Sequence, residues 1–374
     1  MVETLYQNWY FHRPELAERI LSLLLDGPGD PVALVGDRRI GKTSHLLYDL
    51  IPAARKRGFL PVYADIYQNR DAPLAAINYA LQEAVDDIEV PSSKAGKRLK
   101  TSVTKIGMAG ATVDFGEEPT RRRPEDPLLL VDWLLKTLVR LAKKPVLLVF
   151  DEIQELARLP GGESSVSAVR SAITKSKNYV RVVFTGSSQE KLLELFARSR
   201  AALYEGASTL AFPYLGEDFL EFIARKSKER FKKRIAPGEL KQAFERLHHQ
   251  PRALIDLVLL FASSEATSLI AALDDRVESQ LTGTPYDVLW ASMKPLHKRI
   301  CVRIVRGEDV TSSAARQEYA VGTGRKEIAP GTVSGVLRAM VASHILSKPG
   351  GSRARYRIDD PLFAEWIRRA TSQR

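Results

Sequence analysis

The chain has 374 residues, of which 44% are hydrophobic and 27% charged, a balance typical of a soluble protein with more than one domain. No apolar run reaches the roughly 18 residues that cross a bilayer, and the first residues lack the pattern of a secretory signal. The single cysteine, Cys301, lies in an apolar pattern, and six scattered histidines predict no metal cluster. We therefore expect a cytoplasmic protein without disulfides or a resident transition metal.

The positive charge is concentrated near the end of the chain. The formal net charge is +11, which indicates an acidic partner such as nucleic acid. From Tyr286 to the last residue there are 16 Lys and Arg against 8 Asp and Glu, so this quarter carries +8. The excess is local, and we expect the acidic partner to bind there.

The first half of the chain alternates short apolar runs with amphipathic segments. Such a strand–helix rhythm predicts a parallel α/β sheet. The helices are predicted at 8–25, 44–58, 72–88, 127–144 and 164–176, and the strands at 31–35, 59–67, 145–156, 179–188 and 209–212.

Two regions depart from this rhythm. Residues 91–124 are rich in basic residues, with β-like pieces around Gly107–Gly110. They predict a hairpin or an inserted loop, which is either a solvated surface segment or a contact for DNA or a neighbouring subunit. From Glu217 to about Ser279 the sequence is helical throughout, with no strand signal.

The segment that follows the first strand has the pattern G-x-x-x-x-G-K-[ST]. Its glycines allow successive backbone N–H groups to curl around phosphate oxygens, while Lys42 reaches the β- and γ-phosphates and the Thr43 hydroxyl holds Mg²⁺. The pattern follows a strand and opens a helix, as a phosphate-binding loop must. We therefore predict that the chain binds ATP with Mg²⁺ through Gly36, Asp37, Arg38, Arg39, Ile40, Gly41, Lys42, Thr43 and Ser44.

A second pair of acidic residues completes this chemistry. The apolar strand PVLLVF ends at Asp151 and Glu152, and open α/β sheets bind ligands at the carboxyl ends of their strands. We predict that Asp151 belongs to the Mg²⁺ shell and that Glu152 orients or deprotonates the attacking water. The strand 179–188 also ends in polar residues. We expect Ser187 to reach the γ-phosphate or the water, with Thr185 and Ser188 as rivals.

These motifs, GDRRIGKT, VLLVFDE and FTGSS with the later HHQPRAL, resemble those of AAA+/STAND-type ATPases. More narrowly, they are similar to the archaeal-type ATPase family, which is akin to origin-recognition initiators. The resemblance covers nearly the whole chain. It implies a P-loop NTPase core of the ASCE class over residues 1–214, a helical lid over 215–280 and a winged helix-turn-helix over 286–374.

The resemblance also implies roles for several arginines. Pro251 and Arg252 align with the lid motif, so Arg252 is a candidate γ-phosphate sensor and Pro251 a contact for the base; a simple helix start is the rival interpretation. Family members often carry an arginine after the sensor strand that acts on a neighbour's nucleotide. Here the corresponding segment is LYEGA. Arg198 or Arg200 can substitute, or the protein forms no such contact and hydrolyses slowly.

The last quarter predicts a winged helix. Helices are expected at 287–307, 312–321 and 329–346, followed by a hairpin at 347–360. In a DNA-binding version the third helix enters the major groove and the hairpin contacts phosphates. The residues predicted to do so are Thr332, Ser334, Arg338, Lys348, Arg353, Arg355 and Arg357, the last three alternating on one face of a strand.

Taken together, these features predict an ATP-hydrolysing switch or motor that binds double-stranded DNA and can assemble into homo-oligomers. The alternative is a STAND-like signalling ATPase whose winged helix docks a partner protein.

Overall fold

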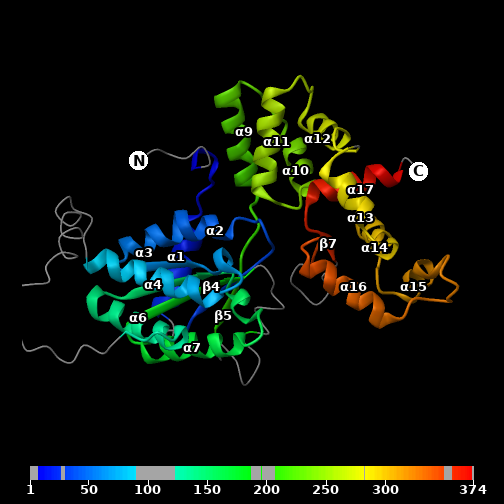
Figure 1. The fold of residues 1–374 in the computed structure, drawn as a ribbon. Coiled ribbons are helices and arrows are strands. Elements are labelled where there is room, and N and C mark those ends of the chain that lie inside the picture. Colours follow the sequence, from blue (N-terminus) through cyan, green and yellow to red (C-terminus); the bar gives the residue numbers. More distant parts are fainter. Residues whose placement is uncertain are drawn as a thin grey trace, which may run out of the picture. The chain divides into compact units, whose positions relative to one another are not determined.

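The computed structural model describes residues 7–26, 30–89, 123–186, 195, 207–281, 283–348 and 356–372 (Figure 1). The chain forms two compact units. The first contains His12–Val35 and Thr43–Ala211; the second contains the residues up to Phe11, the loop Gly36–Lys42 and the chain from Phe212 onward. Of the basic insertion predicted at 91–124, only Arg123 and Pro124 lie within the described residues.

The first unit contains a five-stranded parallel sheet. Its strands are β1 (Val32–Val35), β2 (Leu60–Asp65), β3 (Val146–Asp151), β4 (Val180–Gly186) and β5 (Ser208–Ala211). The strand order is β2-β3-β4-β1-β5, so β4 separates the strand before the phosphate loop from the strand that ends at Asp151. The predicted parallel α/β sheet is confirmed.

Helices cover both faces of this sheet. They are α1 (Pro14–Asp26), α2 (Lys42–His45), α3 (Ile51–Lys56), α4 (Pro73–Glu89), α6 (Pro127–Ala142) and α7 (Gly162–Lys175), with short 3-10 turns at Ile66–Asn69 and Ile153–Ala157. In β3, Leu147 and Val149 pack with the α1 side, whereas Leu148 and Phe150 pack with α4, α6 and α7. A strand covered on both faces must be apolar throughout, which is why PVLLVF shows no polar alternation.

A π turn over Leu46–Leu50 joins α2 to α3. Pro52, near the start of α3, has no N–H to donate to the carbonyl four residues earlier. The single predicted helix 44–58 is therefore continuous in direction but not in hydrogen bonding. It ends near Gly58, whose φ of +85° suits glycine.

The second unit begins, after the phosphate loop, with four helices. These are α9 (Glu217–Phe231), α10 (Pro237–Arg246), α11 (Pro251–Ser263) and α12 (Leu269–Glu278) (Figure 1). They share one apolar core that includes Phe219, Leu240, Val258 and Leu273. The described residues between Glu217 and Ser279 thus contain helices and no strand, as predicted.

The C-terminal part of this unit has the helix and strand order of a winged helix. Its elements are α13 (Pro285–Ser292), α14 (Pro295–Val305), α15 (Ser313–Ala320), α16 (Pro330–Ala342), the antiparallel strands β6 (Leu346–Ser347) and β7 (Arg357–Ile358), and α17 (Pro361–Ser372). The prediction of one helix over 287–307 is wrong. Pro295 forces an extended backbone before it, so one helix ends at Ser292 and a second begins at Pro295.

Within the part of the chain that the structure describes, no helix is long and apolar enough to cross a membrane.

Candidate functional site: a phosphate loop and an acidic strand end

The loop Gly36–Lys42 connects β1 to α2, and the side chain of Lys42 folds back onto the backbone of the same loop. Lys42 is 5% exposed, and its amino group donates to the carbonyl oxygens of Gly36 at 2.8 Å and Asp37 at 2.6 Å. Arg39 and Gly41 have φ values of +62° and +97°. Left-handed backbone positions of this kind occur in loops whose N–H groups converge on an anion.

Gly36 lies in close contact with its neighbours. A Cβ at this position would lie 2.8 Å from Cδ1 of Ile40 and 3.1 Å from Cβ of Phe212. Both distances are shorter than normal carbon contacts, so a larger residue would require the Ile40 side chain and Phe212 to shift.

The variable residues of the loop are bonded to other parts of the second unit. Asp37 accepts a hydrogen bond from the Tyr214 hydroxyl, and its carboxylate lies 3.5 Å from the guanidinium of Arg357 in β7. Arg38 lies 2.7 Å from Nδ1 of His344, just after α16. The residues between the two loop glycines therefore contact the winged-helix module directly.

Asp151 is the centre of a buried hydrogen-bond network at the carboxyl end of β3. Its side chain is 3% exposed. The Thr43 hydroxyl donates to Oδ2 at 2.6 Å, the Tyr63 hydroxyl donates to Oδ2 at 3.1 Å, and the buried Thr185 hydroxyl donates to Oδ1. Three donors on one carboxylate fix its orientation.

Glu152 has an unusual backbone. Its φ of +57° is left-handed, which costs a non-glycine residue about 1–3 kcal/mol. The same residue donates its N–H to the Thr185 hydroxyl at 3.2 Å, and its carboxylate accepts from Gln154. The turn lifts the Glu152 side chain out of the strand direction, where it remains partly exposed.

Two further residues, Tyr63 and Asp65, belong to this cluster and were not predicted from the sequence. Asp65 ends β2 directly beside Asp151 in the neighbouring strand. Burial raises the pKa of Asp65, and the nearby charges of Asp151 and Glu152 raise it further. Burial and the same two carboxylates raise the pKa of the Tyr63 hydroxyl. The signal was present, because YAD at the end of the second strand parallels VFD at the end of the third.

The remaining predicted nucleotide contacts lie at separate points. Ile40 is buried, Ser44 is half-buried, and Pro251 occupies the first turn of α11. Arg252 is exposed and binds the Asp256 carboxylate through two contacts of 2.9 Å. Ser187, Arg198 and Arg200 lie outside the described residues.

The predicted DNA contacts divide into three groups. The side chains of Thr332, Ser334 and Arg338 are exposed on α16, and Lys348 is exposed after β6. Arg357 is half-buried and paired with Asp37. Arg353 and Arg355 lie outside the described residues.

Among the described side chains, no group of three or more His, Cys, Asp or Glu residues forms a metal site. The oxygen donors at Thr43 and Asp151 nevertheless suit Mg²⁺, which uses one or two protein carboxylates together with phosphate and water oxygens.

Comparisons with known proteins define the fold. No family model matches the chain, and no curated protein matches it significantly. Solved structures do match. The Walker-type ATPase of Pyrococcus abyssi is 19% identical, covers 96% of both chains and gives a TM-score of 0.62. The ORC2 protein of Aeropyrum pernix in complexes with ADPNP and ADP is 14% identical, covers 96% of this chain and 92% of its own, and gives a TM-score of 0.53. The chain therefore has the fold of archaeal-type P-loop ATPases related to origin-recognition proteins.

Proposed function

We propose that this protein binds ATP with Mg²⁺ and hydrolyses it. The observation that carries the proposal is the Thr43–Asp151–Thr185 cluster, which begins at the residue directly after the phosphate loop. The similar A. pernix protein has been solved in complexes with ADPNP and ADP, which supports nucleotide as the ligand.

Each residue of the proposed site has a chemical role. Lys42 exchanges its two carbonyl contacts for phosphate oxygens, and the N–H groups of the loop bind the β-phosphate. Thr43 and Asp151 would hold Mg²⁺, which when bound would offset the charge on the phosphates. Glu152 accepts a proton from the attacking water, and Thr185 orients Asp151 and the Glu152 backbone.

Arg252 is proposed as the γ-phosphate sensor. To act in this way it must leave Asp256, with which it forms an i,i+4 ion pair on the exposed side of α11. Such exposed pairs stabilise a helix by only about 0.3–0.5 kcal/mol, so a triphosphate competes easily for the guanidinium. Ser187 and one of Arg198 or Arg200 remain proposed contacts from this chain or a neighbouring copy.

We also propose that the protein binds double-stranded DNA through α16 and the wing, and so acts as a nucleotide-dependent switch. The exposed Thr332, Ser334 and Arg338 and the +8 charge of the last quarter support this. The bonds from Asp37 to Tyr214 and Arg357 support a link between the two ligands. A triphosphate adds negative charge beside Asp37, and this charge competes for Arg357.

Gel shifts with duplex DNA test this interface. The variant Thr332→Ala/Arg338→Gln changes exposed side chains of α16, and Arg353→Glu/Arg355→Glu changes the wing. Lys294→Gln is the matched control, since it removes an exposed cation just before α14. Affinity that falls in the first two variants and not in the control supports the DNA function. Affinity unchanged in all three refutes it.

One observation favours docking of a partner protein instead. Val288 on α13 and Val321 after α15 are 67% and 66% exposed in the same module. Exposed apolar side chains of this kind are found at protein interfaces. If the chain binds no duplex DNA at low salt but Val288→Asp abolishes capture of a specific protein partner, the signalling function replaces the DNA function.

A further inference from the structure

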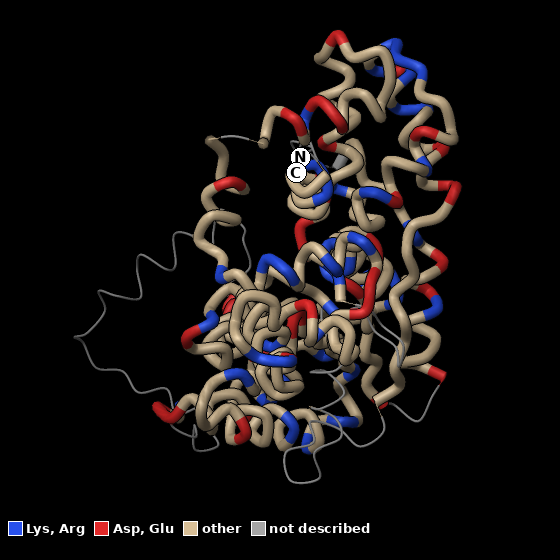
Figure 2. Tube along the Cα trace, turned by 90° about the vertical axis from the view of Figure 1, so that its right-hand side faces the viewer, with Lys and Arg blue, Asp and Glu red and all other residues tan. Residues whose placement is uncertain are grey.

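A second concentration of positive charge lies on the helix α9, outside the C-terminal quarter. Between Arg225 and Arg234 the chain carries seven Lys and Arg residues and one acidic residue, Glu229. These ten residues form the last turns of α9 and the segment before α10. Figure 2, in which basic residues are blue and acidic residues red, shows the two signs interspersed over most of the chain. The segment 225–234 departs from that mixture.

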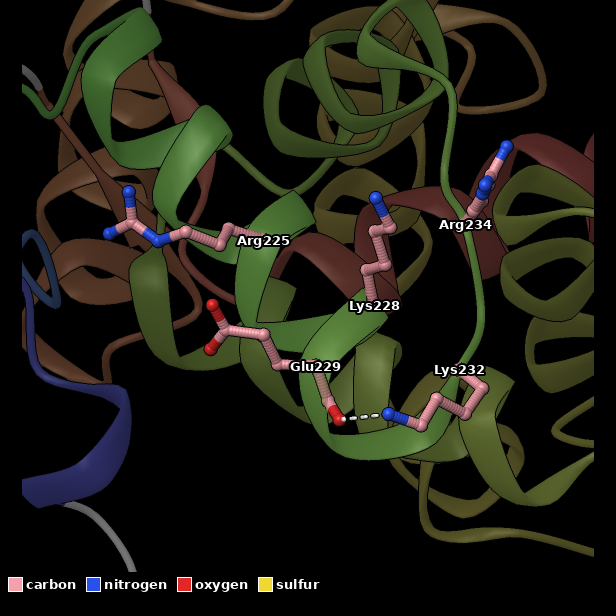
Figure 3. Close-up of a pocket in the computed structure, with 5 residues that line it drawn as sticks. All are labelled: Arg225, Lys228, Glu229, Lys232 and Arg234. Atoms are coloured by element: carbon pink, nitrogen blue, oxygen red, sulfur yellow. Dashed lines mark hydrogen bonds between the residues drawn. The ribbon is translucent and has the colours of Figure 1, made fainter.

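Cationic side chains of this segment line one hollow (Figure 3). Arg225 and Lys228 come from α9, and Lys232 and Arg234 from the residues that follow it. Together with Glu229 they surround a cavity of about 420 Å³. All four cationic side chains are exposed, so their charged groups are accessible to a ligand.

Within the described residues, no carboxylate lies within ion-pair distance of these four cations. Their recorded contacts are weak: Lys232 reaches the carbonyl of Glu229 at 3.4 Å, and Arg225 lies 5.8 Å from the ring of Phe222. The C-terminal module is different. Many of its arginines are engaged with carboxylates of the same chain, namely Arg303, Arg316, Arg357, Arg368 and Arg369.

The end of α9 does not account for this charge. A helix C-terminus carries roughly half a negative charge, which one or two cations in its last turn offset. Lys228 and Arg230 already occupy that turn. The segment has a net charge of +6, so most of its charge has no partner in the helix itself.

The spacing of the cations fits a phosphate backbone. Arg225 and Lys228 are an i, i+3 pair on one face of α9, and Lys232 directly follows the last residue of the helix. The seven residues from Arg225 to Phe231 rise about 10 Å, and one strand of duplex DNA places a phosphate every ~3.4 Å along its axis. A stripe of this length spans roughly three phosphates. We propose that the lid segment Arg225–Arg234 is a second contact for double-stranded DNA, independent of base sequence.

Duplex DNA fits the cavity better than a single strand. Single-strand sites combine cations with aromatic rings on which bases stack. The residues around this cavity are four cations and one glutamate, with no aromatic ring among them. The lining therefore offers contacts to phosphates and none to bases.

This inference rests on the proposed DNA-binding function, and the salt dependence of binding tests it separately. The variant is Arg225→Gln/Lys228→Gln/Arg234→Gln. The control is Arg55→Gln/Lys56→Gln/Lys144→Gln, which removes the same three charges from exposed positions of the other unit. Both are compared with wild type by fluorescence anisotropy on one duplex at several salt concentrations, after their thermal midpoints and ATP affinities have been shown to match wild type.

The lid variant is expected to lower the slope of log affinity against log salt by roughly 2 to 3, because each phosphate contact contributes about 0.9. The control should keep the wild-type slope. Equal slopes in wild type and lid variant, with binding still sensitive to α16 substitutions, overturn the lid contact and leave the proposed function standing. A wild-type protein that binds no duplex overturns the proposed function itself. Inorganic phosphate that binds wild type and not the lid variant, while the two have equal salt slopes on duplex DNA, assigns the cavity to the free anion and overturns the DNA contact.

Discussion

Thr185→Val removes one hydroxyl from the centre of the proposed site and keeps the size of the side chain. Thr185 is fully buried; it donates to Oδ1 of Asp151 and accepts the N–H of Glu152 at 3.2 Å. A hydrogen bond to a charged group contributes about 1.5–3 kcal/mol. Since about 1.4 kcal/mol is a factor of ten, losing this hydrogen bond corresponds to roughly 10- to 150-fold weaker Mg²⁺ binding through Asp151.

We therefore expect Thr185→Val to need that much more Mg²⁺ to bind a fluorescent, non-hydrolysable ATP analogue. Affinity for the analogue without Mg²⁺ should change little, because the loop N–H groups and Lys42 remain. Thr185→Ser keeps the hydroxyl and should behave like wild type. If Thr185→Val titrates with Mg²⁺ as wild type does, Thr185 does not orient Asp151 for metal binding.

Three further predictions concern stability. Burial, Asp151 and Glu152 raise the pKa of Asp65 in the folded state, so the ionised carboxylate destabilises the fold at neutral and higher pH. The variant Asp65→Asn, which still caps the following turn, should therefore raise the thermal midpoint at pH 8. A gain in thermal midpoint that does not shrink in acid would contradict this prediction. Burial, and after it Arg357, lower the pKa of His248 to about 4, so stability should fall as the pH drops from 6.5 towards 4. Asparagine tolerates the φ of +53° at this position. The variant His248→Asn should therefore show a smaller change of thermal midpoint across the same pH range. Arg246 forms ion pairs with Glu365 at 2.7 Å and Asp274 at 2.8 Å. The variant Arg246→Met should lower the free energy of unfolding of the helical unit by about 1–3 kcal/mol, measured by urea titration with tryptophan fluorescence. An unchanged urea midpoint would mean that these ion pairs contribute nothing to stability.

The sheet and the helices α9 to α12 were predictable because their signals are local. A strand covered on both faces must be apolar along its whole length, and PVLLVF followed by two acids has few other interpretations. The fold confirms the parallel sheet, in which β4 lies between β1 and β3. The break before Pro295 was missed because the apolar period continues across it, although the residue before a proline disfavours helix.

The partners of the site residues were harder to predict than the residues themselves. Asp65 becomes a neighbour of Asp151 only through strand register, and Tyr214 reaches Asp37 across 177 residues of sequence. Sequence distance hides such contacts. The basic segment 225–234 is not evident from the charge of the last quarter, because its net charge of +6 lies within ten residues outside that quarter.

Hydrolysis of ATP by wild type, Lys42→Ala and Glu152→Gln, with and without Mg²⁺, tests the central claim most directly. Wild type should hydrolyse ATP only with Mg²⁺. Lys42→Ala should lose about 10²- to 10³-fold in rate, as expected when a positioned charge is removed from a transition state. Glu152→Gln should bind ATP with near wild-type affinity and turn it over at least as slowly. Hydrolysis that survives both substitutions would contradict the assignment of the site.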